Sequence, residues 1–137
     1  MGRILGLDPG TVRVGVAVSD PLGITAQPHS SLEASDPEII DRIAELVAGL
    51  DVEVVVVGLP ISLDGSEGPA AVAARRFADR VTAGIGDIPV ELHDERFSSV
   101  TAERTMIEMG ARRSDRKAAR DRVAAAVFLQ TYLDGRA

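Results

Sequence analysis

The chain has no cysteine among its 137 residues. It can therefore form no disulfide, bind no metal through a thiolate and use no cysteine nucleophile, and this composition suits a reducing compartment. There is no run of about 18 apolar residues, and the N-terminus lacks the charged and then apolar plan of a secretion signal. From these absences we expect a soluble protein of the cytoplasm without a membrane partner.

Aromatic residues and positive charge are also scarce. The chain has no tryptophan, one tyrosine and three phenylalanines, so aromatic platforms for stacking bases are few. The formal net charge of −6 argues at first against a nucleic-acid partner. Between Arg96 and Arg122, however, eight basic and four acidic residues give +4, which leaves −10 for the remainder. This basic run predicts a phosphate-facing patch, although two solvated helix faces would produce the same pattern.

The size and the apolar patterning predict one layered α/β domain over residues 1–137. Helical patterns begin at Asp36-Pro37 and at three later places, and the expected strands and helices alternate after the third strand. The strands are expected at 4–7, 12–19, 24–28, 52–59 and 88–92, and the helices at 36–50, 70–83, 98–110 and 116–133. The first two strands should form an antiparallel hairpin because the link between them is too short for a crossover. The strands joined by helices should be parallel.

The first candidate site residue is Asp8. It ends the apolar strand 4–7 and precedes the turn Pro9-Gly10-Thr11. A carboxylate at the end of a buried strand is costly to desolvate unless a positive charge or a ligand pairs with it. Asp-Pro-Gly is also good turn chemistry, so the stretch alone leaves both a turn acid and a ligand-binding acid open.

A second acid, Glu95, is expected close to Asp8. It follows the last predicted strand within His93-Asp94-Glu95-Arg96. Ligands of open α/β sheets bind beyond the carboxyl ends of the strands, where both acids are expected. The central strand between them ends near Gly58, which has no side chain to obstruct a ligand.

A third acid, Asp121, breaks the apolar pattern of the last helix. The inward stripe of this helix consists of Ala118, Ala124, Ala125, Phe128, Leu129 and Tyr132. An acid in such a row favours a functional role, because local rules are most often broken at sites, although Asp121 could also cap the start of the helix. Asp115 follows Ser114 at the expected helix start and is interpreted as structural, since an acid there stabilises the helix dipole.

Three carboxylates without histidine or cysteine form an oxygen-only site, which suits Mg²⁺ or Mn²⁺. Two such ions can support the hydrolysis of a phosphodiester. Nearby basic and hydroxyl side chains would then contact the phosphates. The candidates are Thr11, Arg13, Arg96, Arg113, Arg116 and Lys117. His29 and His93 are not needed, no nucleophile turn supports a Ser-His-Asp triad, and no P-loop or Gly-x-Gly-x-x-Gly motif occurs.

These motifs together resemble the YqgF/RuvX family of the RNase H-like superfamily. The matching stretches are residues 7–20, 57–60, 64–68 and 94–96, then Lys117, Asp121, Ala124, Ala125, Leu129, Gln130, Tyr132 and Leu133. Ser62 and the pair Ser98-Ser99 depart from the family pattern, which affects a loop and a helix cap. The resemblance implies a three-layer RNase H-like fold with a mixed five-stranded sheet of order 3-2-1-4-5 and an antiparallel second strand. It also places the acids of a metal-dependent nuclease on Asp8, Glu95 and Asp121.

The family implies an endonuclease that acts on structured nucleic acid. The expected substrate is the 5′ end of precursor 16S rRNA during ribosome biogenesis, with the ribosome as a further partner, and the rival substrate is a four-way Holliday junction. Two other classes stay open: a nucleotide-binding protein of the actin-like kind, which would need a second lobe, and a non-catalytic nucleic-acid-binding module. A junction resolvase would require a homodimer, whereas a nuclease that trims RNA can act as a monomer.

Overall fold

The computed structural model describes residues 2–62, 64–94 and 113–136, with residues 113–120 described by their backbone alone. The described elements follow the chain in an α/β order. They are β1 (Arg3–Pro9), β2 (Arg13–Ser19), β3 (Ala26–Glu33), α1 (Ile39–Gly49), β4 (Val52–Leu59), α2 (Pro69–Ile85), β5 (Val90–Asp94) and α4 (Arg113–Gly135). Among the described residues, no helix combines the length and apolar character that a membrane crossing requires.

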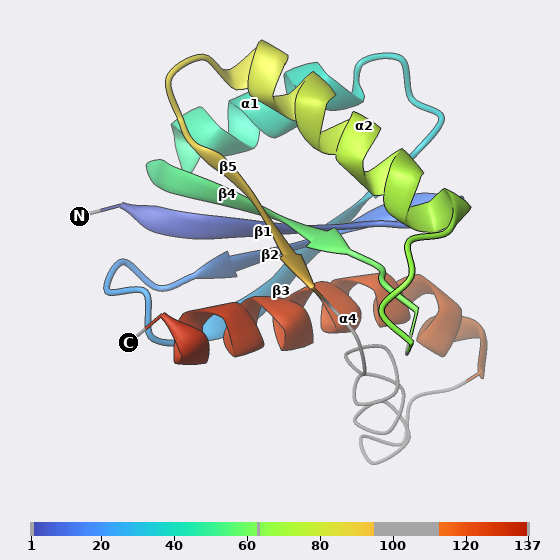
Figure 1. The fold of residues 1–137 in the computed structure, drawn as a ribbon. Coiled ribbons are helices and arrows are strands. Elements are labelled where there is room, and N and C mark those ends of the chain that lie inside the picture. Colours follow the sequence, from blue (N-terminus) through green and yellow to red (C-terminus); the bar gives the residue numbers. More distant parts are fainter. Residues whose placement is uncertain (1, 63, 95–112, 137) are drawn as a thin grey trace.

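The five strands form one mixed sheet in the order β3-β2-β1-β4-β5. β1 pairs antiparallel with β2 and parallel with β4, and β4 pairs parallel with β5. Helices α1 and α2 cover one face of this sheet, and α4 covers the other (Figure 1). The predicted strand order, the antiparallel second strand and the three layers are therefore confirmed.

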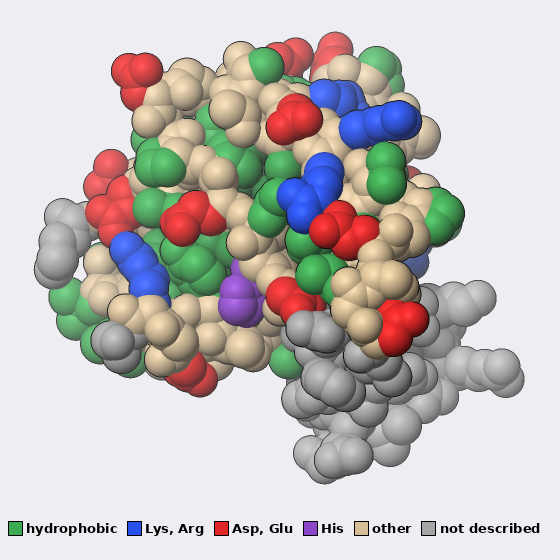
Figure 2. All heavy atoms as spheres, viewed as in Figure 1, with side chains coloured by type: hydrophobic (Ala, Val, Ile, Leu, Met, Phe, Trp, Pro, Cys, Tyr) green, Lys and Arg blue, Asp and Glu red, His purple; other side chains and the backbone are tan. Residues whose placement is uncertain are grey.

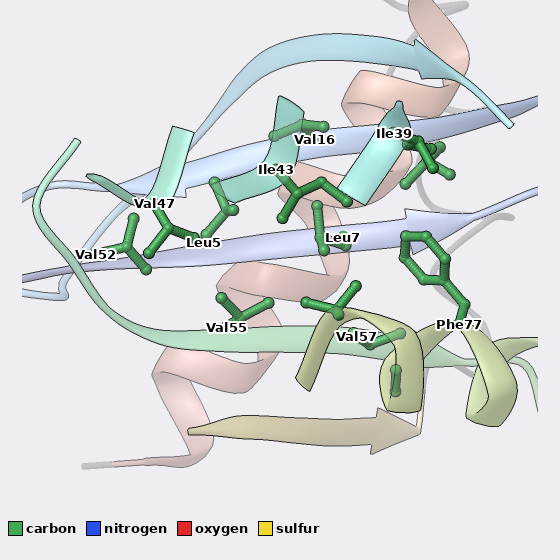
Figure 3. Packing of buried hydrophobic residues seen from close by; sticks show 13 residues of the cluster. Leu5, Leu7, Val16, Ile39, Ile43, Val47, Val52, Val55, Val57 and Phe77 are labelled. Carbon is green, nitrogen blue, oxygen red and sulfur yellow. The ribbon is translucent and has the colours of Figure 1, made fainter. Parts of the chain in front are cut away.

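Side-chain alternation along β1 explains why the sheet needs a helical layer on both faces. Leu5 and Leu7 belong to the core under α1 and α2, whereas Ile4 belongs to the core under α4. Figure 3 shows Leu5 and Leu7 among the side chains of β4 and α1, with Phe77 of α2 beside them. Because each face of β1 carries apolar side chains, burying only one face would leave the other in water.

Several element boundaries differ from the sequence-based expectations. α1 begins at Ile39 instead of Asp36-Pro37, because Asp36 forms a preceding turn in which its Oδ1 accepts a hydrogen bond from the Glu38 backbone N–H at 2.9 Å. β3 extends to Glu33, and β5 runs two residues further than expected, so that it includes His93 and Asp94. α2 and α4 each begin before their expected first residue. The expected helix 98–110 lies outside the described residues.

One residue on the predicted apolar face of α2 is exposed. The sequence placed Ala73 on the buried face of this helix, but Ala73 is exposed and the neighbouring Ala74 is buried. Ala74 packs with Ala71 against Leu59 at the end of β4. Several alanines follow one another in this segment, so the apolar pattern does not indicate which of them faces the core.

Helix α4 packs on β5 through a cluster of rings. The His93 ring stacks on Phe128 at a centroid distance of 6.5 Å and meets the edge of Tyr132 at 5.6 Å. Burial lowers the pKa of His93, which favours a neutral imidazole. His93 therefore has the surroundings of a packing residue near the end of β5.

Tyr132 should titrate well above the usual pH for tyrosine. Burial, together with the hydrogen bond that its hydroxyl donates to Glu91 Oε2 at 2.7 Å, raises its pKa from 10.0 to about 12. The folded state therefore holds this proton more tightly than the unfolded state. The stabilisation that the protonated Tyr132 adds to the free energy of unfolding should be complete below pH 10 and be lost as the pH rises from 10 to about 12.

This titration can be followed by ultraviolet absorbance of the phenolate. The chain has one tyrosine and no tryptophan, so the signal reports on Tyr132 alone. In Glu91→Gln the transition should move toward pH 10, because the charged acceptor is removed. A wild-type transition at the ordinary tyrosine value would contradict the packing of this helix on β5.

Candidate functional site

The candidate site lies at the edge of the sheet where the parallel strands end. β1, β4 and β5 run in the same direction, and α4 begins beside their carboxyl ends (Figure 1). Asp8 is the last residue but one of β1 and is partly exposed. Side chains along a strand alternate between the two faces of the sheet, so Asp8 lies on the same face as Ile4 and Gly6. Both of these residues contact the α4 layer, and Asp8 therefore faces that layer too.

Gly15 brings Asp121 to this face beside Asp8. Asp8 and Gly15 are direct partners in the ladder between β1 and β2. A Cβ atom placed on Gly15 would lie 1.9 Å from the backbone oxygen of Asp121. The missing side chain therefore lets the backbone of α4 lie directly on β2. Two acids that are distant in sequence are thereby both neighbours of Gly15, near the carboxyl end of β1.

Arg13 forms an ion pair with one of these acids, Asp121. Its Nε donates a hydrogen bond to Asp121 Oδ2 at 2.8 Å, and both side chains are about 30% exposed, 31% for Arg13 and 26% for Asp121. Arg13 alternates with Gly15 along β2 and so points to the same face. The sequence analysis proposed Arg13 as a phosphate contact but did not predict this ion pair, since nothing in the local pattern links β2 to α4.

Of the other candidate site residues, the structure describes Thr11 in full, the basic residues of α4 by their backbone, and Glu95 and Arg96 not at all. Thr11 is exposed in the turn between β1 and β2. Glu95 and Arg96 lie outside the described residues, directly after Asp94 at the end of β5. The three basic candidates of α4 lie in its first turns, and Lys117 precedes Asp121 by about one helical turn. They are Arg113, Arg116 and Lys117, whose side chains are not described.

Charge is mixed on the face seen in Figure 2, where Lys and Arg side chains lie among Asp and Glu side chains. Most of the basic run found in the sequence falls between residues 96 and 120, for which no side chain is described. The described surface therefore does not test the expected phosphate-facing patch, which stays a prediction.

The described donors are compatible with a hard cation. Asp8 and Asp121 provide carboxylate oxygens at a partly exposed edge, and the ring of His93 at the end of β5 packs against Phe128 and Tyr132. Within residues 2–62, 64–94 and 113–136, no three acidic or histidine side chains cluster as metal ligands. The predicted third acid, Glu95, is outside these ranges. This set of donors fits Mg²⁺ or Mn²⁺ better than zinc, since it contains only oxygen.

Comparison with solved structures shows that this chain shares the fold of RuvC. Thermus thermophilus RuvC in complex with a Holliday junction substrate has a TM-score of 0.62 and 17% identity, and the match covers 99% of this chain and 96% of that one. A second Thermus thermophilus RuvC structure has a TM-score of 0.57 and 18% identity, and covers 98% and 95% of the two chains. At this identity the similarity establishes the fold, which confirms the RNase H-like prediction.

Sequence comparison reaches nearly the whole chain. A protein of Listeria monocytogenes named "Putative pre-16S rRNA nuclease" is 45% identical over 135 residues, which cover 96% of this chain and 97% of the relative. A protein of Myxococcus xanthus with the same name is 44% identical over 133 residues, covering 96% and 87%. The model of the RuvX family, described as "Holliday junction resolvase", matches residues 2–135. On these matches and on its fold, the chain belongs to the RuvX family.

Proposed function

We propose that this chain is a metal-dependent endonuclease that cleaves precursor 16S rRNA near its 5′ end. The observation that supports the proposal is that Gly15 has Asp8 as its ladder partner and the backbone of Asp121 packed against it, near the carboxyl edge of the sheet. The names of the relatives from Listeria and Myxococcus support the rRNA substrate. In this proposal the chain acts as one domain in the cytoplasm and meets its substrate on assembling ribosomes, as a monomer.

In the proposed site, Asp8, Asp121 and Glu95 hold Mg²⁺ or Mn²⁺. The bound cation supplies Lewis-acid stabilisation of the charge that develops on the phosphate, and a pair of ions can in addition activate the attacking water. The basic residues of the chain orient the phosphate backbone and offset its repulsion by the acids. They are Arg13, Arg96, Arg113, Arg116 and Lys117, with the Thr11 hydroxyl as a further donor.

A four-way DNA junction is the second candidate substrate, favoured by the description of the family model. Cleavage of two opposed strands of a junction would require a symmetric dimer. The two substrates differ in the 2′-hydroxyl and in shape, so they can be separated by direct comparison.

The test offers both substrates to the purified protein under identical conditions. A fragment of precursor 16S rRNA and a four-way DNA junction are incubated with the protein and Mn²⁺, with Asp8→Asn as the control. The proposal expects cleavage of the rRNA fragment by the wild type and none by the variant. Preferential cleavage of the junction would replace the proposed substrate, and binding of either substrate without cleavage would indicate a non-catalytic binding module.

Arg13→Gln should change metal binding and nucleic-acid binding in opposite directions. Removing the guanidinium frees Asp121, so Mn²⁺ should bind the free protein about twofold to fivefold more tightly, as exposed ion pairs are worth 0.2–1 kcal/mol. The loss of one phosphate contact should weaken binding of the substrate and reduce the slope of log affinity against log salt by about 1.

Calorimetry with Mn²⁺ alone and fluorescence anisotropy over a salt series measure the two effects of Arg13→Gln. Arg3→Gln is the matched control, because Arg3 lies at the opposite end of β1 from Asp8. If Arg13→Gln left both affinities at the Arg3→Gln level, Arg13 would have no part in the site.

A further inference from the structure

A pocket of about 370 Å³ lies on the other side of the turn that follows Asp8. Its walls include Pro9, Pro60 and Phe77, and the residues with polar side chains that line it are Thr11 and Arg80. This volume falls within the range of about 300–1,000 Å³ that ligand pockets have. The proposed metal site does not account for this pocket.

The pocket and the acids share one structural element. Pro9 follows Asp8 directly in β1 and therefore faces the α1–α2 layer, whereas Asp8 faces the α4 layer. The turn Pro9-Gly10-Thr11 thus has the acids on one side and the pocket on the other. Both open at the carboxyl edge of the sheet, where ligands of α/β folds bind.

The chemistry of the pocket suits a flat group with apolar faces and polar edges. Two prolines and Phe77 offer apolar walls, and Phe77 is a largely buried core residue that retains 8% exposure. Arg80 and Thr11 can donate hydrogen bonds to carbonyl oxygens or ring nitrogens. A nucleobase has these properties, and Arg80 also provides the positive charge that complements a nucleic-acid backbone.

We propose that this pocket binds one unpaired nucleobase of the substrate while the neighbouring backbone passes over the Pro9-Gly10-Thr11 turn to the acids. The inference rests on the proposed nuclease function and specifies its substrate. Cleavage is directed to phosphates beside an unstacked nucleotide, because a base held in a continuous duplex cannot enter the pocket. A loop, a bulge or a strand end satisfies this requirement.

Binding without a divalent cation tests the pocket separately from cleavage. The probes are a short fluorescein-labelled single-stranded DNA and the same strand with every base replaced by an abasic spacer, both in EDTA. The wild type should bind the intact strand about tenfold more tightly than the abasic strand, as expected for one base stacked in a protein site. Ala73→Leu fills the pocket from α2 and should bind both strands with the affinity that the wild type has for the abasic strand.

Ala83→Leu is the matched control, because Ala83 is exposed on the same helix and does not line the pocket. It should retain the tenfold preference for the intact strand. Arg80→Gln, compared with Arg76→Gln, gives a second pair that does not change the packing of α2, and only Arg80→Gln should reduce the preference.

The outcomes separate the two proposals. If Ala73→Leu and Arg80→Gln both kept the wild-type preference for bases, the base would be bound elsewhere and the pocket assignment would be overturned. Equal wild-type affinity for the two strands would overturn it as well, and capture of an apolar peptide by the pocket would point to a protein ligand instead. A base preference that disappears in Ala73→Leu, in a protein that cleaves no substrate with Mn²⁺, would support the pocket and refute the nuclease.

Discussion

Asp8→Asn should lower the rate of cleavage roughly a thousandfold, as expected when a group that stabilises the charge of the transition state is removed. Asparagine has nearly the same shape as aspartate but carries no charge and has one acceptor oxygen instead of two. Asp8 lies near the end of β1, opposite Gly15, and Gly15 in turn packs against the backbone of Asp121. Loss of its charge should therefore weaken metal binding and catalysis together.

The fold should tolerate Asp8→Asn. Asp8 is only partly buried, and asparagine has nearly the same size and keeps one acceptor oxygen, so the packing around position 8 should be retained. The thermal midpoint of the variant in EDTA should stay close to that of the wild type. A large loss of activity with an unchanged midpoint separates a chemical role of Asp8 from a structural one.

Single-turnover cleavage in Mn²⁺ measures the effect, and calorimetry with Mn²⁺ gives the metal affinity. Asp41→Asn is the matched control, because Asp41 is exposed on α1 and lies outside the proposed site. Asp41→Asn should cleave at the wild-type rate. If Asp8→Asn also did so, the proposed mechanism would be wrong.

The sequence predicted most accurately those elements whose apolar pattern is strong. β4 is almost entirely β-branched, and its observed bounds Val52–Leu59 are those expected. β3 was predicted too short because its second half, from His29 to Ser31, is polar. An edge strand that pairs with β2 on one side needs no continuous apolar pattern, so its length is set by its partner.

The candidate site was predictable where a residue broke a local rule. Asp8 at the end of an apolar strand and Asp121 in an apolar stripe both stood out in this way. Gly15 did not, because a small residue between valines fits any strand that is exposed on one face. Its importance depends on the position of α4 across the sheet, and so does the ion pair of Arg13 with Asp121. Contacts between distant elements depend on their three-dimensional placement, which a local pattern does not contain.

Gly15→Ala should damage both the stability and the activity of the protein. The added Cβ atom would lie 1.9 Å from the carbonyl oxygen of Asp121, which is backbone and cannot rotate away. Helix α4 must therefore shift, at a cost of about 1–3 kcal/mol in the free energy of unfolding, as for other overpacked sites. The shift separates Asp121 from Asp8. A displacement of about 1 Å in a catalytic group can cost about a hundredfold in rate, and a loss of this size is expected here.

Gly49→Ala provides the matched control, because it adds the same methyl group where no atom lies within 4 Å. Gly49 ends helix α1 without a positive φ, so alanine should be neutral or slightly stabilising there. Urea unfolding gives the stability of both variants, and cleavage well below their thermal midpoints gives the rate of the folded protein. Gly15→Ala with full stability and full activity would show that α4 does not rest on β2 at this glycine. Lost stability with an unchanged rate would show that the reaction does not depend on the distance between Asp8 and Asp121. Only the loss of both supports a site in which a missing side chain on β2 holds the two acids together.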